Sequence, residues 1–365
     1  MLNDKSNNMK IIITGACAVS ARSVVRSLRI SEKFKDATFV GWDMAKTLYG
    51  LYEGLFDRIY KVPAVSAPNY RDIISQILER EKPDAIIVVP EVEVLYWSEH
   101  PFDVPCLLPP ADFCKLAISK KEVFRVLGPH NLVPKSFQVL KTDIMRDNYE
   151  SPLGYPVWIR DASAGTASGK GSFKAENINE LRAWAEINTG IDEFQLSQYL
   201  PGGNYGVFMI FDNGSLRKLA IAERIDYIMA KVAVSGITGN TCKGKLLNDD
   251  SIKKTALKAV DLICEETNST MNGLVVCDMK ADEKGVPLVT EINIRHVAFS
   301  SSFANAGFNI SEYQLLLALG RGDELTEEVE MIFPKNNLIL RDVDGQPIYL
   351  KDYHPLGEGD FISAL

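Results

Sequence analysis

Three oxygen-bearing side chains in the second half of the chain carry the strongest chemical signal. Residues 273–295 contain two apolar runs joined by a charged, glycine-containing turn, and this pattern predicts a β-hairpin. Glu291 and Asn293 alternate onto one face of the second strand, and the hairpin can bring Asp278 opposite them. Carboxylates inside an apolar strand lose hydration and repel each other, so they need a cation, and oxygen ligands suit Mg²⁺ that also holds nucleotide phosphates. The alternative is that Asp278 and Glu291 only cap the polar face of the hairpin.

A loop of small residues farther upstream is a second candidate. Arg160 ends an apolar strand, and the segment after it contains Ser163, Gly165 and Lys170. Small side chains leave backbone N–H groups free to approach phosphate oxygens closely. Together with the two basic side chains, this loop predicts a flexible lid over a polyphosphate.

The segment Gln198-Tyr199-Leu200-Pro-Gly-Gly offers a place for an adenine base. The base could lie against its apolar residues and bond to backbone groups, although an ordinary connection between two strands explains the segment equally well. Lys120 lies on the apolar face of a helix expected over residues 112–128. Its stem either snorkels to water or carries the ammonium into a cleft.

The first 111 residues alternate between short apolar runs and helical patterns, which indicates a parallel, doubly wound α/β sheet. The expected strands are 10–14, 38–41, 84–89 and 105–108, and the expected helices are 20–30 and 70–81. The turn at Gly15 has one glycine where a dinucleotide fingerprint has three, and Asp43 lies too far along the chain, so an NAD site is disfavoured. The N-terminus of the first helix can still hold an anionic group.

Glu91 and Glu93 directly follow the expected strand 84–89, at the carboxyl end of the parallel sheet. Ligands of α/β domains bind at this end, so one of the two carboxylates could hold an amino group. The alternative is that both favour the dipole of a following helix.

The second half of the chain predicts an α+β region with antiparallel hairpins. Arg224 and Lys231 belong to a stretch, 224–241, that is expected to be a mobile loop closing the site over a phosphate or carboxylate. His296 follows the second strand of the hairpin and faces either a substrate or the core. The expected strands are 156–160, 193–199, 205–211, 217–222, 274–280 and 287–292, and the expected helices are 249–267 and 311–319.

The composition excludes several classes of protein. The 365 residues, 46% hydrophobic and 24% charged, fit a folded protein of two or three subdomains. A net charge of -8 without a basic stripe disfavours a nucleic-acid partner. Because no apolar run approaches a membrane span and residues 1–10 lack the apolar core of a signal peptide, a cytoplasmic location is expected. The six cysteines lack metal-type spacing and are expected to be structural, and four scattered histidines disfavour a zinc site.

Taken in order, these segments resemble the ATP-grasp superfamily, and within it the carbamoyl-phosphate-synthetase-like carboxylate–amine ligases. The resemblance runs from about Lys10 to Gly320, and its most specific element is Asp278 followed by Glu291-Ile-Asn293-Ile-Arg295, which is similar to a metal-binding pattern ending E-x-N-P-R. It implies a Rossmann-like, pre-ATP-grasp domain over 1–111 and an ATP-grasp domain over 112–320. It also implies a mobile lid subdomain over about 130–197 and a C-terminal extension, 321–365, packed on the core.

The resemblance also implies roles for individual residues. One or two Mg²⁺ ions, or Mn²⁺, would be held by Asp278, Glu291 and Asn293, and Arg295 would lie over an acyl phosphate. Other matches are Arg160 as the cation of the lid strand, Lys120 or its neighbour Lys121 as the first nucleotide-contacting cation, and Gln198, Tyr199 and Leu200 as the adenine hinge. The departures are Asn204, where many relatives place a ribose-binding glutamate, and Ile294 and Asp161, where proline is usual.

The chemistry implied is ATP-dependent formation of an amide between a carboxylate, such as that of an amino acid, and an amine. The carboxylate would attack the γ-phosphate to give an acyl phosphate, and the amine would then displace phosphate, with ADP as the nucleotide product. The alternatives are a carbamoyl-phosphate-type or other phosphotransferase, a catalytically silent ATP-binding regulator and an NAD-linked oxidoreductase. The expected partners are small molecules rather than nucleic acid or membrane, and a homodimer is left open.

Overall fold

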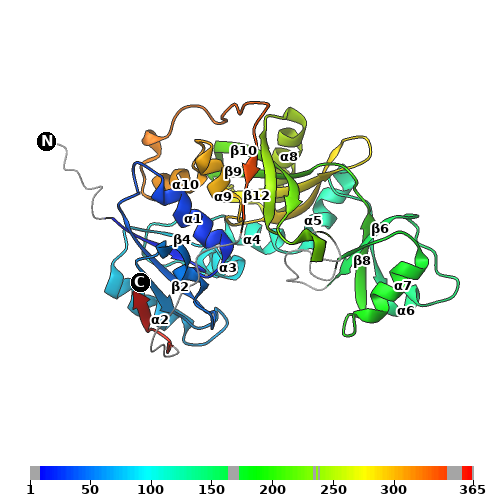
Figure 1. The fold of residues 1–365 in the computed structure, drawn as a ribbon, viewed down its shortest axis with the longest axis horizontal. Coiled ribbons are helices and arrows are strands. Elements are labelled where there is room, and N and C mark those ends of the chain that lie inside the picture. Colours follow the sequence, from blue (N-terminus) through cyan, green and yellow to red (C-terminus); the bar gives the residue numbers. More distant parts are fainter. Residues whose placement is uncertain (1–8, 163–171, 233–235, 237–238, 343–355, 364–365) are drawn as a thin grey trace.

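The computed structural model describes residues 9–162, 172–232, 236, 239–342 and 356–363. Its elements form three sheets, which lie from left to right across Figure 1. The first belongs to the N-terminal region, the second is the large central sheet, and the third belongs to a smaller part at the right. This mixed α/β and α+β architecture confirms the predicted fold class. In the described part of the chain, no helix has the length and apolar character needed to cross a bilayer.

The N-terminal sheet has the strand order β15-β3-β2-β1-β4. Its four N-terminal strands run parallel, as the alternating pattern predicted, and the C-terminal strand pairs antiparallel with β3. The strands are β1 (Lys10–Thr14), β2 (Thr38–Asp43), β3 (Arg58–Lys61), β4 (Ala85–Ile87) and β15 (Phe361–Ser363). The helices of this region are α1 (Val19–Arg29), α2 (Tyr70–Glu81), α3 (Glu91–Glu99) and the 3-10 element η2 (Tyr49–Gly54).

Residues 105–108 do not form the strand that their apolar character predicted. Only an isolated parallel bridge joins Cys106 to Ile86 of β4. Prolines at positions 105, 109 and 110 have no N–H to donate, so the segment cannot continue a ladder of hydrogen bonds.

The helix expected over 112–128 is two helices, α4 (Ala111–Ala117) and α5 (Lys120–Leu127). Ser119 separates them, and its Oγ accepts a hydrogen bond from the backbone N–H of Glu122 at 3.3 Å. A serine followed three residues later by glutamate is a helix-start pattern, and it overrides the continuous apolar face. Lys120 therefore opens α5 instead of lying in the middle of a helix.

The central sheet is antiparallel, with the order β13-β12-β9-β10-β11-β14. Helix α8 covers one face, and α9 and α10 lie between the other face and the N-terminal region, where they contact α1. The strands are β9 (Asn204–Asp212), β10 (Ser215–Tyr227), β11 (Thr241–Leu247), β12 (Gly273–Ala281), β13 (Pro287–Asn293) and β14 (Ile339–Leu340). The helices are α8 (Asp250–Thr267), α9 (Ser300–Asn305) and α10 (Ile310–Ala318), with 3-10 elements η4 (Ala230–Val232) and η5 (Gly322–Glu324).

The stretch 224–241, expected to be a loop, begins as a strand. Arg224 and the residues to Tyr227 continue β10, where Arg224 pairs with both β9 and β11 and Asp226 and Tyr227 pair with β11. Arg224 is therefore held on the central sheet rather than on a mobile segment. Residues 233–235 and 237–238 of this stretch lie outside the described residues.

The third sheet has the order β5-β8-β6-β7 and its own apolar cluster, which includes Val157, Ile159, Phe194 and Leu196. The strands are β5 (Ser136–Leu140), β6 (Val157–Asp161), β7 (Phe173–Ala175) and β8 (Glu193–Gln198), accompanied by α6 (Lys141–Ile144), α7 (Ile178–Ile187) and η3 (Gly128–His130). We call residues 136–198 the small subdomain. The glycine-rich loop with Ser163, Gly165 and Lys170 follows β6 and lies outside the described residues.

The C-terminal residues pack against both of the larger sheets. Lys218 of β10 is almost fully buried, and its ammonium donates to the carbonyl oxygens of Thr326 and Glu328 at 2.9 and 2.6 Å. Phe333 is 3% exposed and belongs to an apolar cluster of the central sheet. The described end of the chain, β15, extends the N-terminal sheet.

Candidate active site

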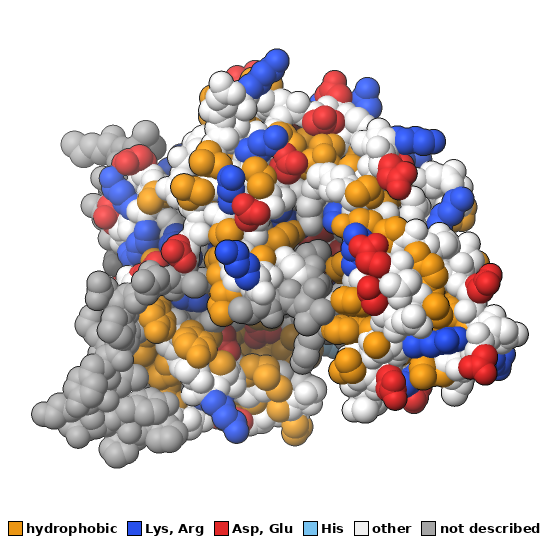
Figure 2. All heavy atoms as spheres, turned by 45° about the vertical axis from the view of Figure 1, so that its right-hand side comes forward, with side chains coloured by type: hydrophobic (Ala, Val, Ile, Leu, Met, Phe, Trp, Pro, Cys, Tyr) orange, Lys and Arg blue, Asp and Glu red, His pale blue; other side chains and the backbone are white. Residues whose placement is uncertain are grey.

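A cavity of about 640 Å³ is lined by residues from the N-terminal region, the central sheet and the small subdomain. A volume of this size suits a small molecule or cofactor. On the face shown in Figure 2, Lys and Arg side chains are interspersed with Asp and Glu rather than gathered into a stripe. The polar lining residues are Ser20, Glu91, Lys120, Arg160, Ser172, Ser197, Gln198, Asn204, Arg224, Asn240, Asp278, Lys280, Thr290, Glu291, Asn293 and Arg295.

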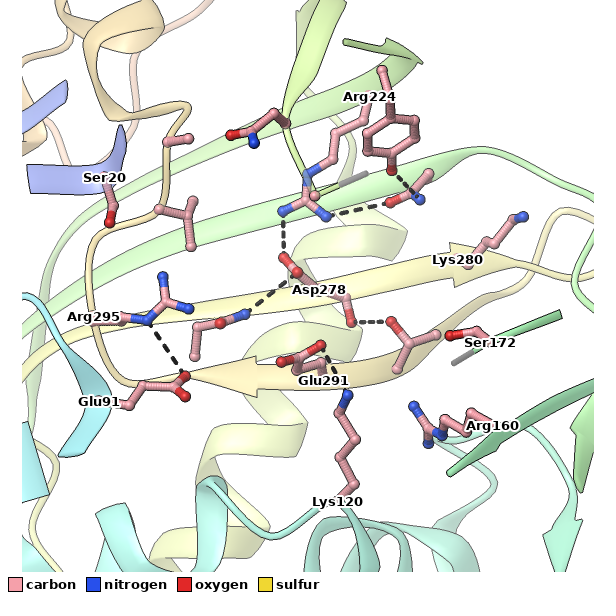
Figure 3. A pocket seen from close by; sticks show the side chains of 18 of the residues that line it. Ser20, Glu91, Lys120, Arg160, Ser172, Arg224, Asp278, Lys280, Glu291 and Arg295 are labelled. Atoms are coloured by element: carbon pink, nitrogen blue, oxygen red, sulfur yellow. Dashed lines mark hydrogen bonds and ion pairs between the residues drawn. The ribbon is translucent and has the colours of Figure 1, made fainter. Parts of the chain in front are cut away.

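Asp278 and Glu291 lie directly opposite each other on β12 and β13. Asn293 is close to both, and its Nδ2 donates to Oδ2 of Asp278 at 3.3 Å. All three residues line the cavity, and Figure 3 shows the side chains of Asp278 and Glu291 on the hairpin. The hairpin geometry predicted from the alternation is confirmed.

The chemistry of this donor set fits Mg²⁺ shared with phosphates. No group of three or more His, Cys, Asp or Glu side chains suited to a metal ion occurs within the described ranges, so the set is two carboxylates and one amide. Mg²⁺ keeps several waters and is usually bound through one or two carboxylates plus substrate phosphates. Two facing carboxylates therefore suffice when a nucleotide supplies the remaining oxygens.

Each carboxylate of the pair is matched by a basic side chain from another element. Lys120 Nζ, at the start of α5, lies 3.4 Å from Oε2 of Glu291. Arg224 of β10 donates to Oδ1 of Asp278, and both side chains are largely buried. Burial alone would lower the pKa of Arg224, but the charge and hydrogen bond of Asp278, together with Tyr227 and Glu291, outweigh it and raise the pKa, so Arg224 remains a cation.

Asn204, at the start of β9, is engaged at both ends of its amide. Its Nδ2 donates to the hydroxyl of Tyr227 at 2.7 Å, and its Oδ1 accepts from Arg224 at 3.4 Å. Both partners belong to β10, so the amide is held against the central sheet.

Arg160 reaches the cavity from β6 of the small subdomain. Its Nε donates to Oε1 of Gln195 at 2.8 Å, and its guanidinium lies 5.4 Å from the centre of the Phe124 ring. Burial lowers the pKa of Arg160, and Glu291 opposes that shift. The side chain thus faces the carboxylate pair across the cavity (Figure 3).

The connection from Gln198 to Gly203 joins the small subdomain to the central sheet. Gln198, Tyr199 and Leu200 line the cavity. The connection is fixed to the end of β12, because Gly202 N–H donates to Ala281 O and Ala281 N–H donates to Gly203 O, both at 2.9 Å. A Cβ at Gly202 would lie 2.8 Å from the Ala281 oxygen, so this close approach requires glycine.

The opposite end of the cavity combines a carboxylate, a guanidinium and two helix N-termini. Glu91 opens α3, and its Oε1 lies 3.6 Å from Nε of Arg295. Ala18, Val19 and Ser20 bring the N-terminus of α1 to the same end (Figure 3). Burial raises the pKa of Glu91, and Arg295 opposes this rise.

Three of the predicted site residues do not face the cavity. Glu93 is 5% exposed and accepts hydrogen bonds from Trp42 Nε1 at 2.9 Å and Tyr70 Oη at 2.7 Å. Residues two apart on a helix point in different directions, so Glu91 and Glu93 cannot both line one site. Lys231 is exposed on η4 and is not among the lining residues.

His296 faces the core rather than a substrate. It is fully buried, with Nδ1 2.9 Å from Ser300 Oγ and Nε2 2.6 Å from Gln314 Oε1. Burial lowers the pKa of His296 to about 4. It is therefore a neutral residue that ties β13 to α9 and α10.

The positions of two side chains bear on alternatives that the sequence left open. Lys120 lines the cavity, whereas its neighbour Lys121 is exposed and is not among the lining residues. Asp43, the candidate ribose ligand of an NAD site, instead accepts from the backbone N–H groups of Cys17 and Ala45 at 2.8 and 2.7 Å. It closes the first turn of the N-terminal sheet.

Lys280, Trp158 and Tyr227 also line the cavity but were not predicted. The alternation along β12 could have predicted Lys280, because it lies two residues after Asp278 and so shares its face of the strand. Trp158 could have been predicted in the same way, because it lies two residues before Arg160 and shares its face of β6. Tyr227 follows a run of consecutive buried residues in β10, and no sequence signal separated it from the core.

No protein-family model and no curated protein sequence matches the chain. Among solved structures, N5-carboxyaminoimidazole synthetase from Staphylococcus aureus, complexed with ADP, is similar with a TM-score of 0.61, covering 91% of this chain and 80% of that one at 16% identity. An L-amino acid ligase from Bacillus licheniformis is similar with a TM-score of 0.59, covering 88% of this chain and 77% of that one at 14% identity. The chain has the ATP-grasp fold.

A third structure with this fold holds a nucleotide together with metal. It is the biotin carboxylase domain of the 2-oxoglutarate carboxylase from Hydrogenobacter thermophilus, in complex with MgADP, ADP and bicarbonate. Its TM-score is 0.56, and the match covers 88% of this chain and 71% of that one at 15% identity. At such identities the likeness concerns the fold. The role of each residue in the cavity rests on the geometry described above.

Proposed function

We propose that the chain is an ATP-dependent ligase that joins a carboxylate to an amine through an acyl phosphate and releases ADP and phosphate. The observation that carries this proposal is the order of side chains along the β12–β13 hairpin. The facing carboxylates Asp278 and Glu291 lie between an aromatic connection at one end and the Glu91–Arg295 pair at the other. This order suits a nucleotide whose terminal phosphate points toward a small polar substrate.

The phosphates would lie at the centre of the cavity. Asp278, Glu291 and Asn293 would hold one or two Mg²⁺ ions, which neutralise phosphate charge when bound. Lys120 and Arg160 approach the same place from α5 and β6, and each would donate to phosphate oxygens. The base would lie against the connection containing Tyr199 and Leu200, where apolar surface and backbone groups are both available.

The first chemical step would transfer the γ-phosphoryl group to a substrate carboxylate. A carboxylate oxygen forms a bond to the γ-phosphorus, and the bond from that phosphorus to the β–γ bridging oxygen breaks, which leaves ADP. Lys120, Arg160 and Arg295 would stabilise the charge on the transferred group, because they are fixed donors in a partly closed cavity. Positioning supplies the rest of the acceleration, so no protein nucleophile is required.

The second step would form the amide. The amine nitrogen attacks the acyl carbon, the bond from that carbon to the phosphate oxygen breaks, and inorganic phosphate leaves with the pair of electrons. The departing phosphate takes up the proton that the nitrogen loses. Glu91 would hold the incoming amino group at the α3 end of the cavity. It is the lining carboxylate that pairs with Arg295, and it does not belong to the Asp278–Glu291 pair that would hold the metal.

The test is ADP release by the purified full chain with Mg²⁺ and ATP, while carboxylates and amines, beginning with amino acids, are supplied in pairs. Mass spectrometry of the product should show the condensed amide. Asp278→Ala and Glu291→Ala should abolish turnover, whereas Lys231→Ala, a change at an exposed position outside the cavity, should leave it intact.

Three other results would contradict the proposal. Release of AMP would exclude an acyl phosphate. A stable phosphorylated product without amide would indicate a phosphotransferase of the carbamoyl-phosphate type. ATP binding without turnover across the full substrate panel would indicate a regulatory nucleotide-binding protein.

A further inference from the structure

Lys280 occupies the nucleotide end of the cavity. It lies two residues after Asp278 on β12 and shares its face of the sheet, which places the two Cα atoms about 7 Å apart along the strand. Lys280 lies toward the connection at Gly202, and Arg295 extends from the opposite end of the hairpin (Figure 3). Along the hairpin, Lys280 thus stands between the carboxylate pair and the aromatic connection.

The ammonium of Lys280 differs from the other cations that line the cavity. Lys120, Arg224 and Arg295 each pair with a carboxylate, and Arg160 donates to Gln195. Within the described part of the chain, the Lys280 ammonium makes no hydrogen bond and no ion pair, and it lies 5.2 Å from the centre of the Tyr199 ring. A partly buried ammonium over an aromatic face retains donors for an acceptor in the cavity.

The residue facing Lys280 does not supply that acceptor. Asn204 is its partner in the β12–β9 register, but the Asn204 amide is engaged with Tyr227 and Arg224. Directly opposed residues of neighbouring strands project from the same face, so a ligand above this pair meets the Lys280 ammonium as its donor. Oxygen acceptors of a bound molecule are the natural partners at this point.

We propose that Lys280 donates a hydrogen bond to a ribose hydroxyl oxygen of the bound nucleotide and thereby distinguishes ribonucleotides from deoxyribonucleotides. The inference rests on the proposed function, which places the phosphates at Asp278 and Glu291 and the base at Tyr199. The ribose connects these two parts of the nucleotide, and Lys280 stands between them.

The experiment measures equilibrium binding of ATP, 2′-deoxy-ATP and 3′-deoxy-ATP with Mg²⁺ to the wild-type chain and to Lys280→Met. Methionine keeps an unbranched apolar stem and removes the donor. The wild type should bind at least one deoxy analogue less tightly than ATP. Lys280→Met should weaken ATP binding by about tenfold, the size of one hydrogen bond from a charged donor, and should bind ATP and that analogue equally.

Lys174→Met is the matched control. The Lys174 ammonium lies 4.4 Å from the centre of the same Tyr199 ring, but it is paired with Glu176 at 2.5 Å and does not line the cavity. This variant should bind all three nucleotides as the wild type does. Urea unfolding should show equal stability for Lys280→Met and the wild type, since no ion pair is removed.

Two results would overturn the inference while the proposed function stands. One is unchanged ATP affinity in Lys280→Met, and the other is an equal loss of affinity for ATP and both deoxy analogues. If the wild type binds no nucleotide at all, the proposed function fails and the inference fails with it.

Discussion

Asp278 has two roles, which substitutions in its ion pair with Arg224 can test separately. Its carboxylate neutralises a buried cation, and it also faces the proposed Mg²⁺-ATP site. The two side chains are 13% and 19% exposed. Asp278→Asn removes the negative charge and leaves the buried Arg224 guanidinium with neutral acceptors, the amide oxygen introduced at position 278 and that of Asn204 at 3.4 Å. Arg224→Met leaves the Asp278 carboxylate facing Glu291 with one fewer cation.

The magnitude follows from the burial of the pair. Removing one partner of a buried ion pair costs about 3–5 kcal/mol, and the residual exposure of this pair places each single substitution near 3 kcal/mol. Replacing both partners removes the uncompensated charge, so Arg224→Met combined with Asp278→Asn should also cost about 3 kcal/mol rather than twice that amount. The coupling between the two positions is then about 3 kcal/mol.

Urea unfolding of the wild type, both single variants and the double variant measures this coupling. Saturating Mg²⁺-ATP, at about a hundred times its dissociation constant, should stabilise the wild type by a further 2.7 kcal/mol or so. It should stabilise neither variant that lacks the Asp278 carboxylate. Additive costs for the two substitutions would refute the ion-pair argument. A double variant that regains stabilisation by Mg²⁺-ATP would refute the assignment of Asp278 to the metal.

Further predictions concern separate parts of the cavity and the core. Lys120→Met should raise the KM for ATP about tenfold through loss of one charged donor, while Lys121→Met, at an exposed neighbouring position, should leave it unchanged in the same steady-state assay. Glu91→Gln should raise the KM for the amine substrate and spare the Kd for ATP, and an equal loss of both would contradict its placement at the substrate end. The pKa of His296 is lowered from 6.5 to about 4, so as the pH falls the unfolded chain takes up a proton at this residue before the folded chain does. The free energy of unfolding should therefore fall by about 3 kcal/mol between pH 7 and pH 4, and His296→Gln, which stays neutral, should lack this component in urea unfolding across that range.

Periodicity predicted most of the fold, because alternation and apolar runs are local properties of the sequence. The parallel strands β1, β2 and β4 and the β12–β13 hairpin were expected from such runs. The strands β5 and β7 of the small subdomain were not, since they are short and carry polar residues on their exposed faces. A short strand is stabilised by its neighbours in the sheet, and those neighbours are distant in sequence.

Site residues could be predicted where the alternation of a strand determines which way their side chains point. They could not be predicted where their position depends on packing between elements distant in sequence. The facing of Asp278 and Glu291 followed from hairpin alternation. The burial of Glu93 against Trp42 and Tyr70 depended instead on which side of α3 meets the core. The same holds for Arg224, whose position on β10 reflects pairing with β9 and β11 beyond the end of its own apolar run.

The small subdomain has an apolar cluster of its own, separate from the clusters of the other two sheets. A unit with its own core and few connections can open independently of its neighbours. The chain enters and leaves it side by side, since Gln198 N–H donates to Lys135 O at 2.8 Å, and the segment leading into it is tied to β13 by Val289 N–H donating to Leu132 O at 2.7 Å. A molecule bound in the cavity would contact Arg160 on one side and the central sheet on the other. It would therefore couple unfolding of the small subdomain to unfolding of the rest of the chain, so that two transitions become one.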